Sequence, residues 1–99
     1  MNIFYLDEDP ILAAQMHCDK HVVKMILESA QLLSTAHRLL DGNKLADERG
    51  LYKATHINHP SSIWVRKSSE NYYWLWNLYD QLLKEYTYRY NKNHASGRL

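Results

Sequence analysis

The residues best suited to acid–base chemistry lie between His17 and Glu28 and continue over the next few helical turns. A helix turns about 100° per residue, so on one helical wheel the polar residues of this region fall within one narrow arc. Most other residues from Val22 to Leu40 are apolar or small, whereas an ordinary surface helix has a polar majority. The pattern predicts a largely buried helix with a single polar arc, made of His17, His21, Lys24, Glu28, Gln31, Thr35 and Arg38.

Three members of this arc, His21, Lys24 and Glu28, lie within two turns of each other, where helical side chains interact. A Glu between low-dielectric walls can act as a general acid or base. The arc therefore predicts an acid–base site. The alternative is that it is only the solvated face of an amphipathic helix.

A metal site is a further alternative. His17 and His21 are four residues apart, a spacing at which two imidazoles on one helix reach the same ion, and His56 or His59 would supply a third ligand. Strong metal motifs add a Glu between the histidines or a second Cys/His pair, and neither occurs here. We therefore expect no metal, and a metal-dependent hydrolase remains an alternative function.

Helix signals indicate how these residues are held. Asp9-Pro10 predicts a helix start, since Asp caps helices and Pro suits the first position. The helical pattern then runs from Pro10 to Leu40, either as one helix or with a break near Cys18-Asp19, and Gly42 ends it. His37 falls on the apolar side of this helix, which predicts a core histidine.

The second half of the chain predicts three further elements. A short helix is expected over 45–53, a helical turn over 63–65 capped by Ser61 and Ser62, and a long aromatic-rich helix over 70–90 capped by Ser68 or Ser69. The polar tail after Asn91 is expected to fray. Because no strand pattern occurs, the sequence predicts an all-α fold: a single compact helical domain, 1–99, with a long central helix and an aromatic-rich C-terminal helix.

Charge and composition indicate which classes of binding partner and which compartment suit this chain. The chain has 12 Lys and Arg against 11 Asp and Glu, a net charge of +1, which argues against tight nonspecific binding to nucleic acid but allows a local basic patch. The aromatic residues of the last helix either pack in the core or stack against bases. Stacking is suggested by the basic residues interleaved with them, Arg66, Lys67, Lys84, Arg89 and Lys92. The single cysteine fits a reducing compartment, and no apolar run reaches the roughly 18 residues of a membrane span. We expect a cytoplasmic protein, in the host cytoplasm if it is phage-encoded.

Several short motifs occur in a recognisable order. Asp19-Lys20-His21 is followed by Glu28 seven residues after the histidine, and then come Asn58-His59-Pro60, an aromatic helix over 72–83, Glu85 and Arg89-Tyr90. In this order the motifs resemble the pyrimidine-dimer DNA glycosylase family, the phage endonuclease V type. The matching pieces cover 1–6, 19–28 and 58–90. The whole chain also resembles small proteins of tailed phages.

The resemblance implies a mechanism. The family uses the α-amine of its first residue to form a Schiff base with the sugar at the damaged site, and elimination then cuts the strand. Because Asn2 is too large for efficient removal of the initiator, Met1 would supply the amine, whose pKa is ordinarily about 8. Glu28 matches the essential carboxylate and His21 a DNA-contacting histidine.

The implied partner is double-stranded DNA with damaged or modified bases, and no cofactor is needed. Asn2, Leu27 and Ser29 stand where the family carries basic residues, which leaves the base that is removed open. The expected DNA contacts are Lys24, His17, Gln31, Asn58, His59, Arg66, Lys67 and Arg89. The non-enzymatic alternative is a viral module that binds a nucleotide or a protein in the same arc.

Overall fold

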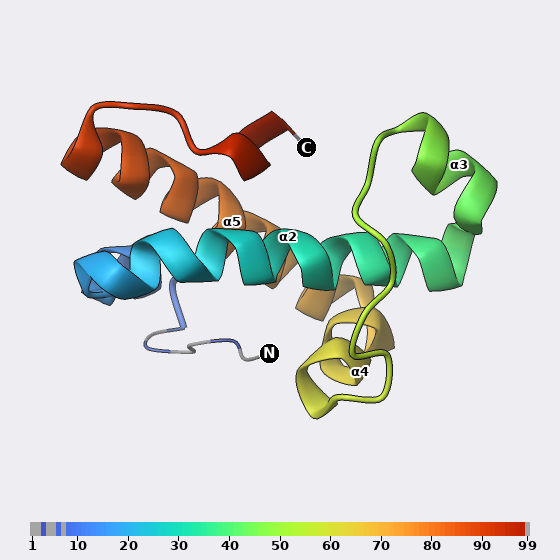
Figure 1. Cartoon of the computed structure of the whole chain (residues 1–99). Helices are drawn as coiled ribbons and strands as arrows, with labels where there is room; N and C mark the ends of the chain where they lie inside the picture. The colour runs from blue at the N-terminus through green and yellow to red at the C-terminus, as the bar shows by residue number, and fades with distance from the viewer. Residues whose placement is uncertain (1–2, 4–5, 7, 99) are drawn as a thin grey trace.

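The computed structural model describes residues 3, 6 and 8–98, and they form an all-α fold with no strand among them. Five α-helices are followed by a 3₁₀ turn (Figure 1): α1 Pro10–Met16, α2 Asp19–Asp41, α3 Asn43–Glu48, α4 Pro60–Lys67, α5 Ser69–Tyr90 and η1 Ala95–Arg98. The radius of gyration, 12.9 Å, is that of one compact domain of about 100 residues. The predicted all-α class is confirmed.

The helical pattern between Pro10 and Leu40 is interrupted at His17 and Cys18. α1 begins as predicted, with the Asp9 side chain accepting a hydrogen bond from the Ile11 N–H at 2.9 Å and Pro10 in the first turn. Both His17 and Cys18 have extended backbone, and α2 starts afresh at Asp19. Of the two predicted possibilities, the broken helix is therefore the one that forms.

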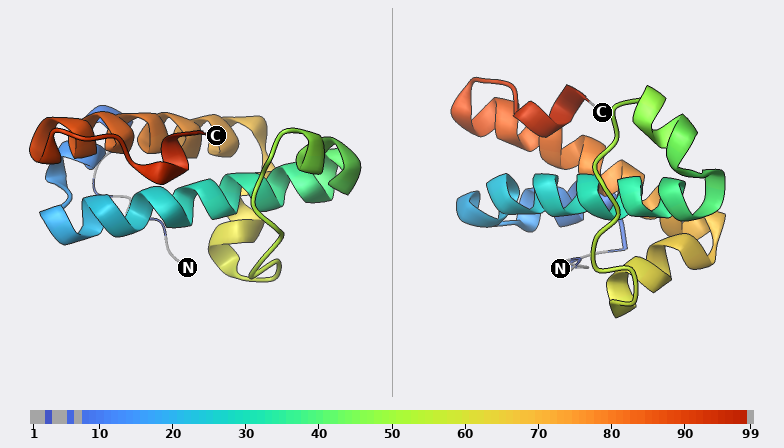
Figure 2. Two further views of the ribbon diagram at one scale, coloured as in Figure 1. Left: turned by 45° about the horizontal axis from the view of Figure 1, so that its top comes forward. Right: turned by 45° about the vertical axis from the view of Figure 1, so that its right-hand side comes forward.

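The core lies between α2 and α5, which pack along each other, with α1 and α4 also packed against α5 (Figure 2). Apolar residues at helical spacing supply it, and the largest fully buried side chains from the two long helices are Val22, Met25, Ile26, Leu32, Leu75, Leu78 and Leu82. Because the core takes one side of α2, the polar arc is left on another side of the same helix.

The starts of the last two helices are set by caps. Ser68 accepts a hydrogen bond from the Asn71 N–H at 3.1 Å, as predicted for α5. The cap of α4 differs from the prediction: the His59 imidazole accepts from the Ser61 N–H at 3.1 Å, and Pro60 takes the first turn. His59-Pro60 is therefore a helix start, because an imidazole can accept a backbone hydrogen bond as a Ser hydroxyl does.

Two other predictions differ from the structure. The predicted short helix forms, but it covers Asn43–Glu48 and not 45–53. Gly50, two residues past its end, has a φ of +68° that suits glycine, and 51–58 is a loop. The tail does not simply fray: η1 packs back on the domain, with Ser96 buried. The Tyr79 hydroxyl donates to the Ser96 carbonyl at 2.5 Å, and the hydroxyls of Tyr52 and Ser96 lie 2.9 Å apart.

Within the described part of the chain, no helix combines the length and the apolar character that crossing a membrane requires.

Candidate functional site

Only part of the predicted polar arc of α2 is accessible in the structure. His21, Glu28 and Gln31 are half-buried on this helix and Lys24 is exposed. Neither the Glu28 carboxylate nor the Lys24 ammonium makes a hydrogen bond or ion pair with any residue that the structure describes. A half-buried carboxylate that bonds none of the described residues is open to a ligand, since buried polar groups normally have hydrogen-bond partners.

The C-terminal end of the arc has a structural role instead. Thr35 is fully buried and its hydroxyl bonds the backbone of Thr55, with an N···O distance of 3.2 Å. The Arg38 guanidinium donates to the Tyr52 and Leu51 carbonyls at 2.6 and 2.9 Å. These bonds fix the loop after α3 on α2, so only His21 to Gln31 remains accessible.

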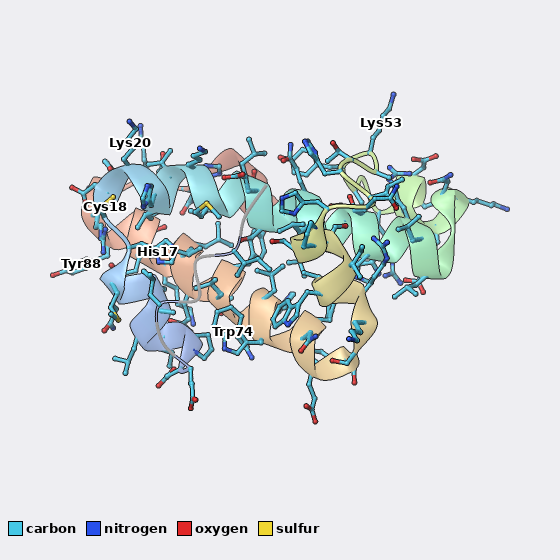
Figure 3. All side chains as sticks on the ribbon, turned by 90° about the horizontal axis from the view of Figure 1, so that it is seen from below. His17, Cys18, Lys20, Lys53, Trp74 and Tyr88 are labelled. Atoms are coloured by element: carbon cyan, nitrogen blue, oxygen red, sulfur yellow. The ribbon has the colours of Figure 1, made fainter. Side chains whose placement is uncertain are left out.

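His17 does not belong to the arc, and its predicted place there is wrong. The break before α2 removes the i,i+4 relation to His21, and the side chain is only 3% exposed. Figure 3 shows His17 in the interior, whereas Cys18 and Lys20 beside it point outward. Its Nδ1 lies 2.6 Å from the Ala13 carbonyl oxygen, so Nδ1–H donates to that oxygen and fixes the end of α1. A buried imidazole in this position offers no surface to a phosphate.

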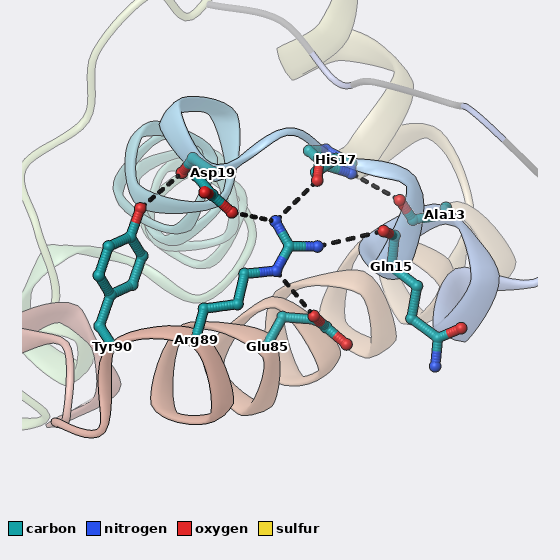
Figure 4. A network of polar contacts seen from close by, with 7 residues as sticks. All are labelled: Ala13, Gln15, His17, Asp19, Glu85, Arg89 and Tyr90. Carbon is teal, nitrogen blue, oxygen red and sulfur yellow. Dashed lines mark hydrogen bonds and ion pairs between the residues drawn. The ribbon is translucent and has the colours of Figure 1, made fainter.

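Arg89, predicted to contact phosphate, is committed within the protein (Figure 4). Its guanidinium donates to the His17 carbonyl at 2.8 Å, the Gln15 carbonyl at 3.1 Å, the Asp19 carboxylate at 3.1 Å and the Glu85 carboxylate at 3.0 Å. These bonds tie the end of α5 to the junction of α1 and α2. Arg89 therefore positions the start of the helix that carries His21 and Glu28.

A pH dependence of stability follows from the burial of His17. Burial lowers the pKa of His17 below the ordinary 6.5, with the charges of His21 and Arg89 adding to the effect against the Ala13 bond. The unfolded chain therefore binds the proton more readily than the folded protein does. Protonation of His17 costs no free energy of unfolding above about pH 6.5, and the free energy of unfolding declines as the pH falls from there towards the folded-state pKa. The slope from this one group is at most about 1.4 kcal/mol per pH unit.

Urea unfolding at about pH 7.5 and about pH 5.5 measures this loss. His17→Asn is expected to remove the His17 share of the difference, while His56→Asn, at an exposed position with φ +49° that Asn tolerates, should retain it. An unchanged difference in His17→Asn would show that this imidazole is protonated equally in both states.

The Asn58-His59-Pro60 motif forms the turn that enters α4. Asn58 is exposed, and His59 is half-buried with Nδ1 accepting from Ser61, so its proton lies on Nε2. That Nε2 makes no hydrogen bond with a described residue, and it remains a donor for a phosphate oxygen. Arg66 holds the turn, donating to the Ile57 carbonyl at 2.7 Å and to the Ser62 hydroxyl at 3.1 Å.

Two described residues before α1, Ile3 and Glu8, show how that part of the chain is held on the domain. Ile3 lines a pocket of about 450 Å³ with Pro60, Ser61 and Trp64. The Trp74 indole donates to the Glu8 carbonyl at 2.8 Å and so fixes the segment before α1 on α5. Met1, the predicted nucleophile, lies outside the described residues. Sequence reasoning missed this anchoring, since no motif links a tryptophan in α5 to residue 8.

The predicted site residues thus fall into three groups. His21, Lys24, Glu28 and Gln31 share one face of α2. Asn58 and His59 lie just before α4, and Arg66 and Lys67 lie in its last turn with Lys67 exposed. The first two groups are connected, because α4 packs against α2. The hydrogen bond between Thr35 and Thr55 also holds the loop before Asn58 on the helix that carries the polar arc. His17 and Arg89 stand apart as a structural pair at the α1–α2 junction.

The described side chains do not form the ligand set that the metal alternative requires. Among the residues with described side chains, no group of three or more His, Cys, Asp or Glu could hold a metal ion. His17 and His21 no longer share a helical face.

His37 was predicted as a core histidine, which is wrong. Its side chain is 30% exposed, and its ring nitrogens face Asp41 at 2.7 Å and the Tyr72 hydroxyl at 2.5 Å. The helical wheel gave its direction correctly, but at that point α2 faces a pocket and not the packed core.

The described residues thus form an all-α domain in which α2 carries Glu28, a half-buried carboxylate that makes no hydrogen bond or ion pair with any of them. The family model described as pyrimidine dimer DNA glycosylase matches residues 1–96. The chain belongs to that family, and DNA is the partner that the family implies. Searches of the curated proteins and of the solved structures found no match.

Proposed function

We propose that this protein is a DNA glycosylase with an associated abasic-site lyase activity, acting on damaged or modified bases in double-stranded DNA. The observation that carries the proposal is Glu28, a half-buried carboxylate on α2 without a partner among the described residues. It stands seven residues after His21, the interval that the motif resemblance assigns to the essential carboxylate. A carboxylate held there stabilises a cationic sugar intermediate electrostatically, an effect that is large where water is partly excluded.

The proposed nucleophile is the α-amine of Met1. The amine attacks C1′ of the sugar, the bond from C1′ to the base breaks, and the base leaves with the electron pair and takes up a proton. Opening of the sugar ring gives a Schiff base between the amine and C1′. Loss of a C2′ proton then expels the 3′ phosphate, and water releases the cut strand. Glu28 is the group that accepts and returns protons during these steps.

The neighbourhood of Ile3 supports this assignment. Chain connectivity keeps the Cα atoms of residues 1 and 3 within about 7 Å of each other. Ile3 lines the same pocket as Pro60 and Ser61, the first residues of α4 after the His59 turn, which supports the proposal that the amine acts near that turn. The loop that leads into the His59 turn is hydrogen-bonded to Thr35 on α2. Thr35 lies about 10 Å along α2 from Glu28, which is two helical turns.

The remaining accessible residues would hold the DNA. On α2, Lys24 and His21 would contact phosphates. On α4, Lys67 would do so together with the guanidinium nitrogens of Arg66 that bond no described residue. Gln31, Asn58 and the Nε2–H of His59 would donate hydrogen bonds to the backbone or a base edge. The damaged nucleotide would leave the stack, which costs least where pairing is already weakened. The exposed free Cys18 suits a reducing compartment, and we place the protein in the cytoplasm.

Borohydride trapping on abasic DNA tests the proposal. The reductant converts a Schiff base into a stable amine, so a covalent protein–DNA adduct is expected. Lys20 is the first site at which trypsin cuts this chain, so the adduct should be found on peptide 1–20. Trypsin should still cut after Lys20, because only the α-amine is modified. Protein acetylated at the α-amine should give no adduct. Strand cleavage without any trapped adduct would rule out the amine mechanism.

Salt dependence tests the DNA contacts. Each phosphate contact contributes about 0.9 to the slope of log affinity against log salt. Lys24→Gln and Lys67→Gln are each expected to lower the slope by about that amount. Lys84→Gln is the control, since Lys84 pairs with Asp80 on an exposed part of α5. Equal slopes for all three variants would place the phosphate path elsewhere.

A further inference from the structure

A second pocket, of about 350 Å³, lies on α2 away from the polar arc. His37 contributes to it from a position nine residues beyond Glu28, which is half a turn round the helix and about 13 Å along it. The pocket is therefore separate from the proposed catalytic face. Its volume is at the lower end of the range of about 300–1,000 Å³ found for small-molecule sites.

A polar relay forms one wall. The carboxylate of Asp41 lies 2.7 Å from Nδ1 of His37, and Nε2 of His37 lies 2.5 Å from the Tyr72 hydroxyl. Burial, with the nearby charges of Tyr73 and Asp41, raises the pKa of Tyr72 above its usual 10.0, so the phenol keeps its proton and donates to Nε2. The Nδ1–H of His37 then donates to Asp41, and the second lone pair of the Tyr72 oxygen remains an acceptor for a ligand N–H.

A cation and an indole complete the pocket. The guanidinium of Arg49 is exposed and makes no hydrogen bond or ion pair with any described residue, yet its charge acts on the Tyr72 hydroxyl. Trp76 is 44% exposed although it lines a pocket, and its indole N–H has no partner among those residues either. Leu33 and Leu51 provide apolar surface between them.

We propose that this pocket is a binding site for a free mononucleotide. The phosphate would pair with Arg49, whose planar fork matches phosphate oxygens. The base would stack on Trp76 against Leu33 and Leu51, as bases do on aromatic platforms, and one of its N–H groups would donate to the Tyr72 oxygen. A planar ring joined to an anion uses every open group of the pocket, whereas phosphate alone would leave the aromatic surface unused and a nucleoside would leave Arg49 unpaired.

Chemical-shift titration of the ¹⁵N-labelled full chain tests this, with deoxyadenosine monophosphate, deoxyadenosine and inorganic phosphate as separate probes and no DNA present. The Trp76 indole N–H and the Arg49 Nε–H are expected to shift with the mononucleotide, and much less with either part. Arg49→Gln and Trp76→Leu should each weaken binding at least about tenfold, the loss of one charge-assisted or stacking contact. Lys53→Gln and Tyr88→Leu, at exposed positions outside the pocket, should bind as the parent does.

Shifts of similar size with phosphate alone would reduce the site to a general anion site and overturn the proposal. So would an unchanged affinity in Arg49→Gln or Trp76→Leu, or the absence of shifts at these two side chains. Because no DNA or strand cleavage enters the measurement, its failure would leave the glycosylase proposal standing, and failure of the borohydride test would leave this one.

Discussion

Glu28→Gln is expected to abolish strand cleavage at abasic sites without lowering thermal stability. Glu28 lies on the polar arc, half-buried, and makes no hydrogen bond or ion pair with a described residue, so folding does not depend on its charge. The amide keeps the shape but can neither stabilise a cationic sugar nor accept a proton. Loss of either effect typically slows such chemistry by about 10²–10⁴-fold.

Single-turnover cleavage of an abasic duplex measures this effect, together with thermal unfolding of the same preparation. Glu48→Gln, at an exposed position at the end of α3, is the matched control and should cut at the parent rate. If Glu28→Gln also cuts at the parent rate, Glu28 has no part in the mechanism.

Arg89→Met is expected to produce the largest loss of stability among changes at the predicted site residues. The side chain is 19% exposed, and its guanidinium serves two carbonyls of the α1–α2 junction and two carboxylates. Methionine fills similar space without a donor, so the Asp19 and Glu85 carboxylates lose a charged partner. We expect a loss of about 2–3 kcal/mol, which for a domain of this size lowers Tm by on the order of 10–20 °C.

Thermal and urea unfolding measure this loss, and two variants sharpen it. Arg89→Lys should recover little, because an ammonium cannot span four acceptors in the guanidinium plane. Lys84→Met, which removes one exposed ion pair from the same helix, should change stability by less than about 1 kcal/mol. If Arg89→Met instead keeps its stability while the salt slope of DNA binding drops by about one, Arg89 is a phosphate ligand.

Local signals in the sequence determined the helices and their order. Asp9-Pro10 predicted the start of α1 and Ser68 the start of α5, since caps act through hydrogen bonds to residues only two or three positions away. The apolar spacing of α2 predicted that much of this helix is buried, although Val23, Leu27 and Leu40 are exposed. The order of short motifs predicted the family that the comparison found. Each of these properties depends on residues close together in the chain.

Tertiary packing decided which polar residues stay available. The sequence alone does not distinguish Lys24 from four other polar residues that could contact DNA, namely His17, Thr35, Arg38 and Arg89. They are used within the fold because segments distant in sequence supply their partners: residues 51–55 for Thr35 and Arg38, and the α1–α2 junction for Arg89. A periodic pattern gives the direction of a side chain but not what lies in that direction, so it placed His37 in a core where the fold has a pocket.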